Sequence, residues 1–275
     1  MHLDYLQKIL KENTDTVQAF KRNLVKDYLQ ILVLSYLYSH KNYRDLIFYG
    51  GSALRHCYEL ERLSEDLDFV DTNNTDLEKM AKDMVIFFKK ELDRDIVCKC
   101  QKFRVYLKIP ILHTLGLAHT SESDLLYLKI EIFNEFNFSN YETKIIPIFK
   151  FNKSLLIKTF DLPTLMATKI NAVLYRKWEK TSKEGKTLCT VKGRDYYDLL
   201  WYLHKKIIPN IQCIKGIKSH KELKMKLLET VKNVDAKSIE LDLLAFINDT
   251  TFVKNLSGNL THIISEQIQQ VLYKK

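Results

Sequence analysis

The sequence has few residues that break or cross-link a chain. Its 275 residues include 7 Gly and 4 Pro, and none of these form a Gly/Ser-rich or Pro-rich stretch, so we expect no long flexible linker. The 5 cysteines are odd in number and lack a paired CxxC pattern, and the 8 histidines show no metal-ligand spacing. A disulfide framework or a structural zinc site is therefore not expected.

Long apolar runs are also missing. No stretch of 18 apolar residues occurs, and the first residues lack the basic start and apolar core of a secretion signal. We therefore expect a soluble, cytoplasmic protein with no membrane partner. Because 46% of the residues are apolar, the chain can bury one large core and carry a second, smaller lobe.

Positive charge is concentrated in the second half of the chain. Residues 1–143 contain 19 Lys and Arg against 22 Asp and Glu, whereas residues 144–275 contain 24 against 12. This asymmetry favours a polyanionic partner, with nucleic acid as the first candidate. A lysine-rich composition that only keeps the protein soluble is the alternative.

The first half of the chain mixes helical and strand patterns. Apolar spacing predicts one or two helices over residues 3–38, and the run Leu46–Tyr49 predicts a buried strand that stops at a Gly-Gly turn. Ser52 would then cap the helix that follows. Alternation with a period of two predicts a strand from Asp66, and the other predicted elements are a helix over 75–93 and strands over 96–109 and 125–136.

After about residue 160 only helical patterns remain. They predict helices over residues 162–178, 195–206, 220–231, 239–248 and 260–272. The sequence therefore predicts an α+β fold, in which a catalytic lobe of residues 1–155 contains a mixed sheet with flanking helices. A basic, helical lobe of residues 156–275 follows it.

Gly50-Gly51-Ser52 lies where a strand gives way to a helix. Free backbone N–H groups, a short hydroxyl and the positive end of a helix dipole suit a phosphate group there. Most such turns have no ligand, so the motif gains its meaning from the acidic residues that follow.

Two carboxylates lie on one face of the next predicted strand. Leu67 alternates with Asp66 and Asp68, so the two acids point to the same side, and Glu131 is available on the polar face of a separate strand. Carboxylate oxygens are the ligands that Mg²⁺ or Mn²⁺ prefers, and three of them would complete a metal site. A lone Asp-x-Asp pair is more often a solvated strand edge.

These motifs together resemble the AbiEii/AbiGii-type toxin family of the DNA polymerase β-like nucleotidyltransferase superfamily. The similarity is carried by the segments GGSALR at residues 50–55, RLSEDLDF at residues 62–69 and KIEI at residues 129–132. It continues in the Lys169-bearing helix and in KGRDYYDL at residues 192–199. The resemblance covers roughly residues 46–203, and the last seventy residues show no motif.

The resemblance implies a nucleotidyltransferase-type sheet, a helical carboxy-terminal lobe and a nucleoside triphosphate (NTP) donor. It implies that Gly50, Gly51 and Ser52 hold the triphosphate, that Asp66, Asp68 and Glu131 hold the metals, and that Lys169 and Asp198 complete the catalytic set. Arg62 and Arg194 are further candidates for nucleotide binding. The third acid of the superfamily is often Asp, so Glu131 is a departure from the pattern.

Several of these residues have a second interpretation. Lys169 could be a surface lysine whose stem lies on apolar neighbours, and Arg194, Asp195 and Asp198 could form a structural ion-pair network. Ser64, beside the acidic pair, is either a site of regulatory phosphorylation or a residue that only turns the chain.

The acceptor is predicted from charge. The basic stretch 176–193 is expected to be a loop beside the active site, and with the basic second half it favours RNA, such as a tRNA 3′ end, as the acceptor. It contains Arg176, Lys177, Lys180, Lys183, Lys186 and Lys192. The resemblance also implies a toxin with a cognate antitoxin. A protein or small-molecule acceptor, or a silent nucleic-acid-binding module, are the alternatives.

Overall fold

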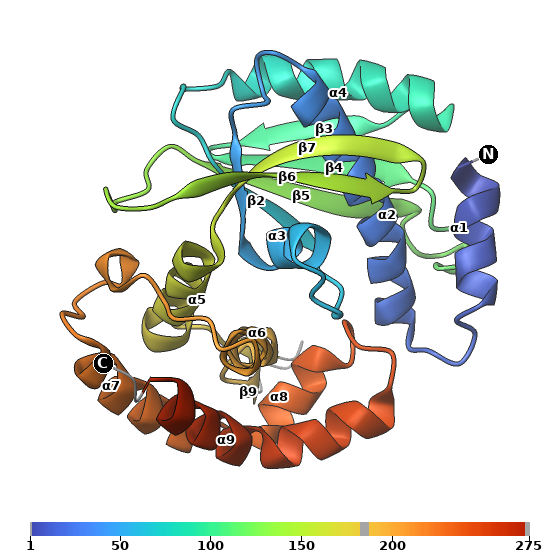
Figure 1. The fold of residues 1–275 in the computed structure, drawn as a ribbon. Helices are drawn as coiled ribbons and strands as arrows, with labels where there is room; N and C mark the ends of the chain where they lie inside the picture. The colour runs from blue at the N-terminus through green and yellow to red at the C-terminus, as the bar shows by residue number, and fades with distance from the viewer. Residues whose placement is uncertain (1, 182–186, 273–275) are drawn as a thin grey trace. The chain divides into compact units, whose positions relative to one another are not determined.

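The chain forms two compact units. The computed structural model describes residues 2–181 and 187–272 (Figure 1). The first unit comprises the residues up to Phe136 together with Thr143–Thr159, and the second comprises Asn137–Glu142 and the residues from Phe160 onward. Lys183 and Lys186 of the predicted basic loop lie outside the described residues.

A seven-stranded mixed sheet forms the first unit's centre, which confirms the predicted fold class. Its strand order is β3-β4-β5-β2-β1-β7-β6. The central strand β2 runs parallel to β5 and antiparallel to β1, while β1 runs parallel to β7. The strands are β1 (Ile47–Tyr49), β2 (Asp66–Val70), β3 (Val97–Gln101), β4 (Arg104–Pro110), β5 (Leu125–Phe133), β6 (Thr143–Lys150) and β7 (Lys153–Phe160).

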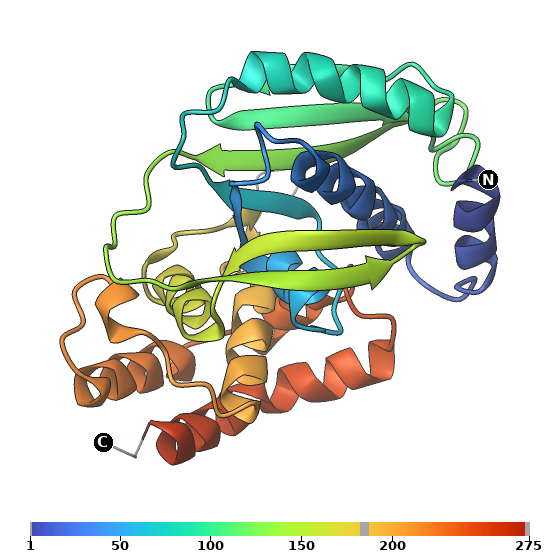
Figure 2. The same ribbon diagram turned by 45° about the horizontal axis from the view of Figure 1, so that its top comes forward.

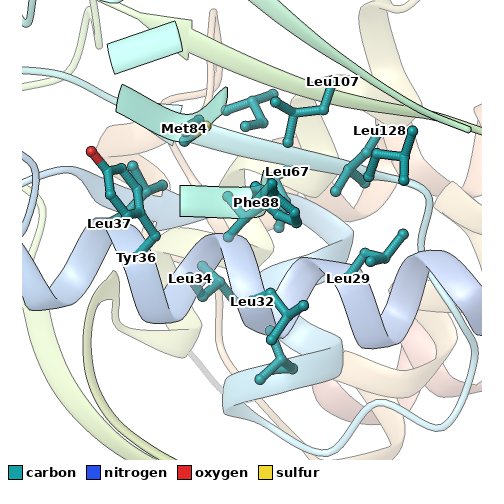
Figure 3. Packing of buried hydrophobic residues seen from close by; sticks show 14 of the residues in the cluster. Leu29, Leu32, Leu34, Tyr36, Leu37, Leu67, Met84, Phe88, Leu107 and Leu128 are labelled. Atoms are coloured by element: carbon teal, nitrogen blue, oxygen red, sulfur yellow. The ribbon is translucent and has the colours of Figure 1, made fainter. Parts of the chain in front are cut away.

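Helices pack on this sheet through a continuous apolar core. They are α1 (His2–Lys11), α2 (Gln18–Ser39), α3 (Gly50–Cys57) and α4 (Leu77–Leu92). Leu29 and Leu32 of α2, and Phe88 of α4, belong to one buried cluster with Leu67 of β2 and Leu128 of β5 (Figure 3). Since Leu67 faces this core, the neighbouring Asp66 and Asp68 face the opposite side of the sheet.

One strand prediction needs correction, and one hairpin was not predicted. The segment predicted as one strand over 96–109 is the hairpin β3–β4, because Lys102 takes a left-handed conformation (φ 55°) and turns the chain. The hairpin β6–β7, yellow-green in Figure 2, has no counterpart in the sequence prediction. Its turn uses Phe151 and Asn152, both with positive φ, in place of the glycine that normally marks such a turn.

The second unit is mainly helical. It contains α5 (Leu162–Tyr175), α6 (Gly193–His204), a short 3₁₀ helix η1 (Ile211–Cys213), α7 (His220–Lys232), α8 (Ala236–Leu243) and α9 (Thr250–Val271). Within the predicted basic loop, β8 (Lys180–Thr181) pairs with β9 (Thr187–Cys189), so that stretch is partly a two-stranded sheet. No helix in the described part of the chain is long and apolar enough to cross a membrane.

Side-chain caps explain why these helices begin where they do. Asp161 caps α5 by accepting a hydrogen bond from the Thr164 N–H, 3.1 Å away. Asp249 caps α9 in the same way through the Phe252 N–H at 2.8 Å. The helix therefore starts at Thr250, ten residues before the predicted start, and it continues through Gly258.

Candidate active site

The Gly-Gly turn fits tightly against acidic and basic side chains. Strand β1 ends at Tyr49, and α3 begins directly at Gly50 with φ +79°. A methyl group on Gly50 would come within 2.6 Å of Asp68 Oδ2, and one on Gly51 would come within 2.6 Å of Arg62 Nη2. The positive φ of Gly50 favours glycine at that position, and the Asp68 carboxylate and the Arg62 guanidinium lie beside the turn.

Ser52 has a different role from the predicted helix cap. The helix starts two residues earlier, without a side-chain cap, and Ser52 is fully buried in its first turn. Its hydroxyl hydrogen-bonds the Asp66 carbonyl oxygen and lies 2.9 Å from Ser64 Oγ. Ser52 thus joins the start of α3 to the start of β2, and contact of its hydroxyl with a triphosphate stays a prediction.

The three predicted metal ligands come from two adjacent parallel strands. In the register of β2 and β5, Asp66 lies opposite Lys129, and Asp68 lies opposite Glu131. All four are half-buried, whereas Leu67 between the aspartates is fully buried. The sheet therefore brings Asp68 and Glu131, 63 positions apart in the sequence, next to each other on one polar face.

Two cations that the sequence analysis did not assign to the site form ion pairs with Asp66 and Glu131. Lys129 Nζ lies 2.9 Å from Asp66 Oδ2 and 3.0 Å from Glu131 Oε2. Arg104 Nε donates to the other oxygen of the same carboxylate, Glu131 Oε1, at 2.6 Å. The sequence contained a signal for Lys129 only, because Lys129 precedes Glu131 by two residues on one strand and so shares its face. The pairing of Arg104 with Glu131 follows from the register of β4 and β5.

Asp66 and Glu131 differ in their electrostatic environment. Burial and the neighbouring Glu65 raise the pKa of Asp66, although Lys129 opposes the shift. Burial also disfavours the charged form of Glu131, but hydrogen bonds from Arg104 and Lys129 outweigh it and lower the pKa of Glu131. Glu131 is therefore held as a carboxylate, which suits a ligand of a cation better than a proton acceptor.

The donor set fits a hard divalent cation by its chemistry. The three acids supply only oxygen atoms, which such a cation prefers. Among residues 2–181 and 187–272, however, no group of three or more His, Cys, Asp or Glu is arranged to hold a metal ion. The Lys129 ammonium group lies between two of these acids, 2.9 Å from Asp66 Oδ2 and 3.0 Å from Glu131 Oε2.

A buried polar network contacts Ser64, two residues before β2. Gln30 of α2 is fully buried, and its amide donates to the Ser64 carbonyl at 3.1 Å while its oxygen accepts from His56 Nε2 at 2.8 Å. Burial lowers the pKa of His56 to about 4, so the ring is neutral at pH 7. The sequence signal for this network was a single polar residue in the apolar run of α2, and the sequence analysis missed it.

Lys169, Asp195 and Asp198 form a buried ion cluster within the second unit. Lys169 Nζ lies 2.7 Å from Asp195 Oδ1 and 2.8 Å from Asp198 Oδ2, and Arg176 reaches Asp195 Oδ2 at 2.8 Å. Lys169 is therefore not the surface lysine of the alternative interpretation. The cluster matches the structural ion-pair alternative for the two aspartates, and the catalytic role of Lys169 and Asp198 stays a prediction.

Arg194 contacts Asp242 of α8 and Phe246. Its backbone N–H and its Nε both donate to Asp242 Oδ2, at 3.0 and 3.2 Å, and its guanidinium lies 4.1 Å from the centre of the Phe246 ring. These contacts fix the first turn of α6 to residues around α8. Binding of a nucleotide by Arg194 stays a prediction.

The fold and the acidic site agree with the comparison to known families. The chain is a nucleotidyltransferase. It belongs to the family described as nucleotidyl transferase AbiEii toxin, Type IV TA system, which matches residues 34–272. The resemblance in the sequence motifs is thereby confirmed, and the match extends through the carboxy-terminal helices, where no motif was recognised.

Other comparisons found similar structures but no similar curated sequence. JHP933 from Helicobacter pylori has 17% sequence identity, with 90% of this chain and 94% of that chain covered and a TM-score of 0.48. A candidate nucleotidyltransferase from H. pylori has 17% identity, with coverages of 90% and 96% and a TM-score of 0.47. A search of the curated proteins gave no match.

Proposed function

We propose that this nucleotidyltransferase transfers a nucleoside monophosphate from an NTP to a hydroxyl group of RNA, such as a tRNA 3′ end. One observation carries the proposal: Asp68 lies against the Gly50 turn, and Glu131 lies opposite it on the neighbouring strand. A turn that accepts phosphate beside a carboxylate site is the arrangement that nucleotidyl transfer needs. The basic second half of the chain favours a polyanionic acceptor.

The reaction replaces a phosphoanhydride bond of the NTP with a phosphodiester bond to the acceptor. The acceptor oxygen forms a bond with the α-phosphorus, the bond from that phosphorus to the bridging oxygen of the β-phosphate breaks, and pyrophosphate leaves. The proton of the acceptor hydroxyl passes to water. The backbone N–H groups at the start of α3 and the Arg62 guanidinium can stabilise the negative charge that develops on the phosphate oxygens.

Asp66, Asp68 and Glu131 would hold Mg²⁺ or Mn²⁺. A divalent cation supplies positive charge at the phosphates and lowers the pKa of the attacking hydroxyl. The protein prepares the site by fixing the two aspartates on one strand and by keeping Glu131 ionised. A toxin of this class would act with a cognate antitoxin, as the family description indicates.

A labelled-NTP incorporation assay tests the proposal. Wild-type protein is incubated with each labelled NTP, total RNA and Mg²⁺, and label bound to RNA, to protein and to small molecules is separated. Asp66→Asn should lower incorporation by about 10²–10³-fold, as expected when a key electrostatic element is lost. Asp95→Asn, at a side chain that is 86% exposed, serves as the matched control.

Each outcome has one meaning. Label in RNA that depends on Asp66 supports the proposal. Label found only in protein or in a small molecule would overturn the RNA acceptor, and equal incorporation by wild type and Asp66→Asn would overturn the site.

A further inference from the structure

Lys129 lies where a cation between two carboxylates would lie. Its Nζ is almost equidistant from Asp66 Oδ2 (2.9 Å) and Glu131 Oε2 (3.0 Å). These oxygens belong to different strands, so the lysine joins β2 to β5 across the polar face of the sheet. A single ammonium group thus occupies the space between two of the three acids that the proposed function assigns to the metal.

The ammonium group of Lys129 is held close to both acids, because it lies within 3.0 Å of one oxygen of each carboxylate. Its side chain is 26% exposed, with Asp66 at 25% and Glu131 at 13%. The two ion pairs are partly shielded from water and are therefore stronger than pairs on the open surface.

We propose that Lys129 is a built-in counter-ion of the active site that competes with the divalent cation for Asp66 and Glu131. This inference rests on the proposed function, because it takes these acids as metal ligands. Without a metal, the lysine neutralises carboxylates that would otherwise repel each other on one face of the sheet. Binding of a divalent cation then requires the ammonium group to leave both carboxylates.

The alternative is that Lys129 supports the site by holding the carboxylates in place. The two roles predict opposite effects of removing the ammonium group. A competing lysine weakens metal binding, so its removal should strengthen that binding. A supporting lysine orients the ligands, so its removal should weaken it.

A titration with Mn²⁺ alone separates these roles without any measurement of activity. Free Mn²⁺ is followed by electron paramagnetic resonance in the absence of nucleotide. Lys129→Met keeps the length of the side chain and removes its charge, and it should bind Mn²⁺ about tenfold more tightly because two partly buried ion pairs no longer have to break. Lys129→Arg keeps the charge and should bind Mn²⁺ within about threefold of the wild type.

Matched controls come from the same sheet. Lys108 of β4 lies over the Tyr127 ring at 5.5 Å, on the same face as Lys129, so Lys108→Met removes a nearby charge without freeing these carboxylates and should leave Mn²⁺ affinity close to the wild-type value. Asp66→Asn should lose the site. Thermal denaturation of every variant confirms that the protein is folded.

The outcomes distinguish this inference from the proposed function. Tighter binding by Lys129→Met but not by Lys108→Met supports the inference. Unchanged or weaker binding by Lys129→Met, with binding that still depends on Asp66, overturns the inference and leaves the proposed function standing. If neither the wild type nor Lys129→Met binds Mn²⁺ in a manner that depends on Asp66, both fall.

Discussion

Replacing Gly50 by alanine should damage catalysis far more than stability. The new methyl group would lie 2.6 Å from Asp68 Oδ2, and ordinary contact begins near 3.4 Å, so the carboxylate must retreat by roughly 0.8 Å. A displacement of about 1 Å at a reacting centre can cost about 10²-fold in rate. We therefore expect Gly50→Ala to lower nucleotide incorporation by about 10²-fold.

The backbone cost of this substitution can be measured separately. Gly50 has φ +79°, where a residue with a side chain is strained by about 1–2 kcal/mol. Gly116 has a similar φ of +66°, and a methyl group there would meet nothing within 4 Å. Gly116→Ala therefore carries the same backbone strain without any steric contact, and it is the matched control.

Incorporation of labelled NTP and urea denaturation should be measured for both variants. Both should lose about 1–2 kcal/mol of unfolding free energy, because the flexible end of Asp68 can move aside cheaply. Only Gly50→Ala should lose activity. The reasoning is refuted if Gly50→Ala keeps activity within about threefold of Gly116→Ala.

Two further predictions concern stability. Gln30→Leu leaves the Ser64 carbonyl and the His56 N–H without their partner, so urea denaturation should show a loss of roughly 1–3 kcal/mol for each buried group; a loss below about 0.5 kcal/mol would contradict the network. Burial opposes the ionisation of Asp195, but Lys169 and other cations lower its pKa from 3.8 to about 2. Its contribution of about 2 kcal/mol should be complete above pH 4 and be lost as the pH falls towards 2, and Asp195→Asn should remove this part of the pH dependence.

The sequence was sufficient to predict the strand that carries the acids. Alternation of apolar and polar residues places Asp66 and Asp68 on one face, and β2 has this pattern. The helices with a clear apolar spacing were also predictable, including α2 and α7. These features depend on local periodicity, which a single sequence contains.

Other features depend on contacts between distant residues and could not be predicted. Lys129 appeared only as a polar residue of a strand, because its partners follow from the parallel register of β2 and β5. The burial of Ser52 depends on Ser64 and Asp66 reaching it from the next loop and strand. The turn of β6–β7 uses Phe151 in a left-handed conformation, which a phenylalanine rarely adopts, so no residue pattern indicated a hairpin there.

The parallel pairing of β2 with β5 also affects when the site can form during synthesis. Asp66 and Asp68 are translated long before Glu131, and Phe48 of β1 pairs with Thr159 of β7, 111 positions later. Such pairings form slowly because long loops must close first. A growing chain that ends before β5 therefore contains the Gly-Gly turn and both aspartates but has no neighbouring strand to supply the third acid, so a partly made polypeptide cannot assemble the carboxylate set.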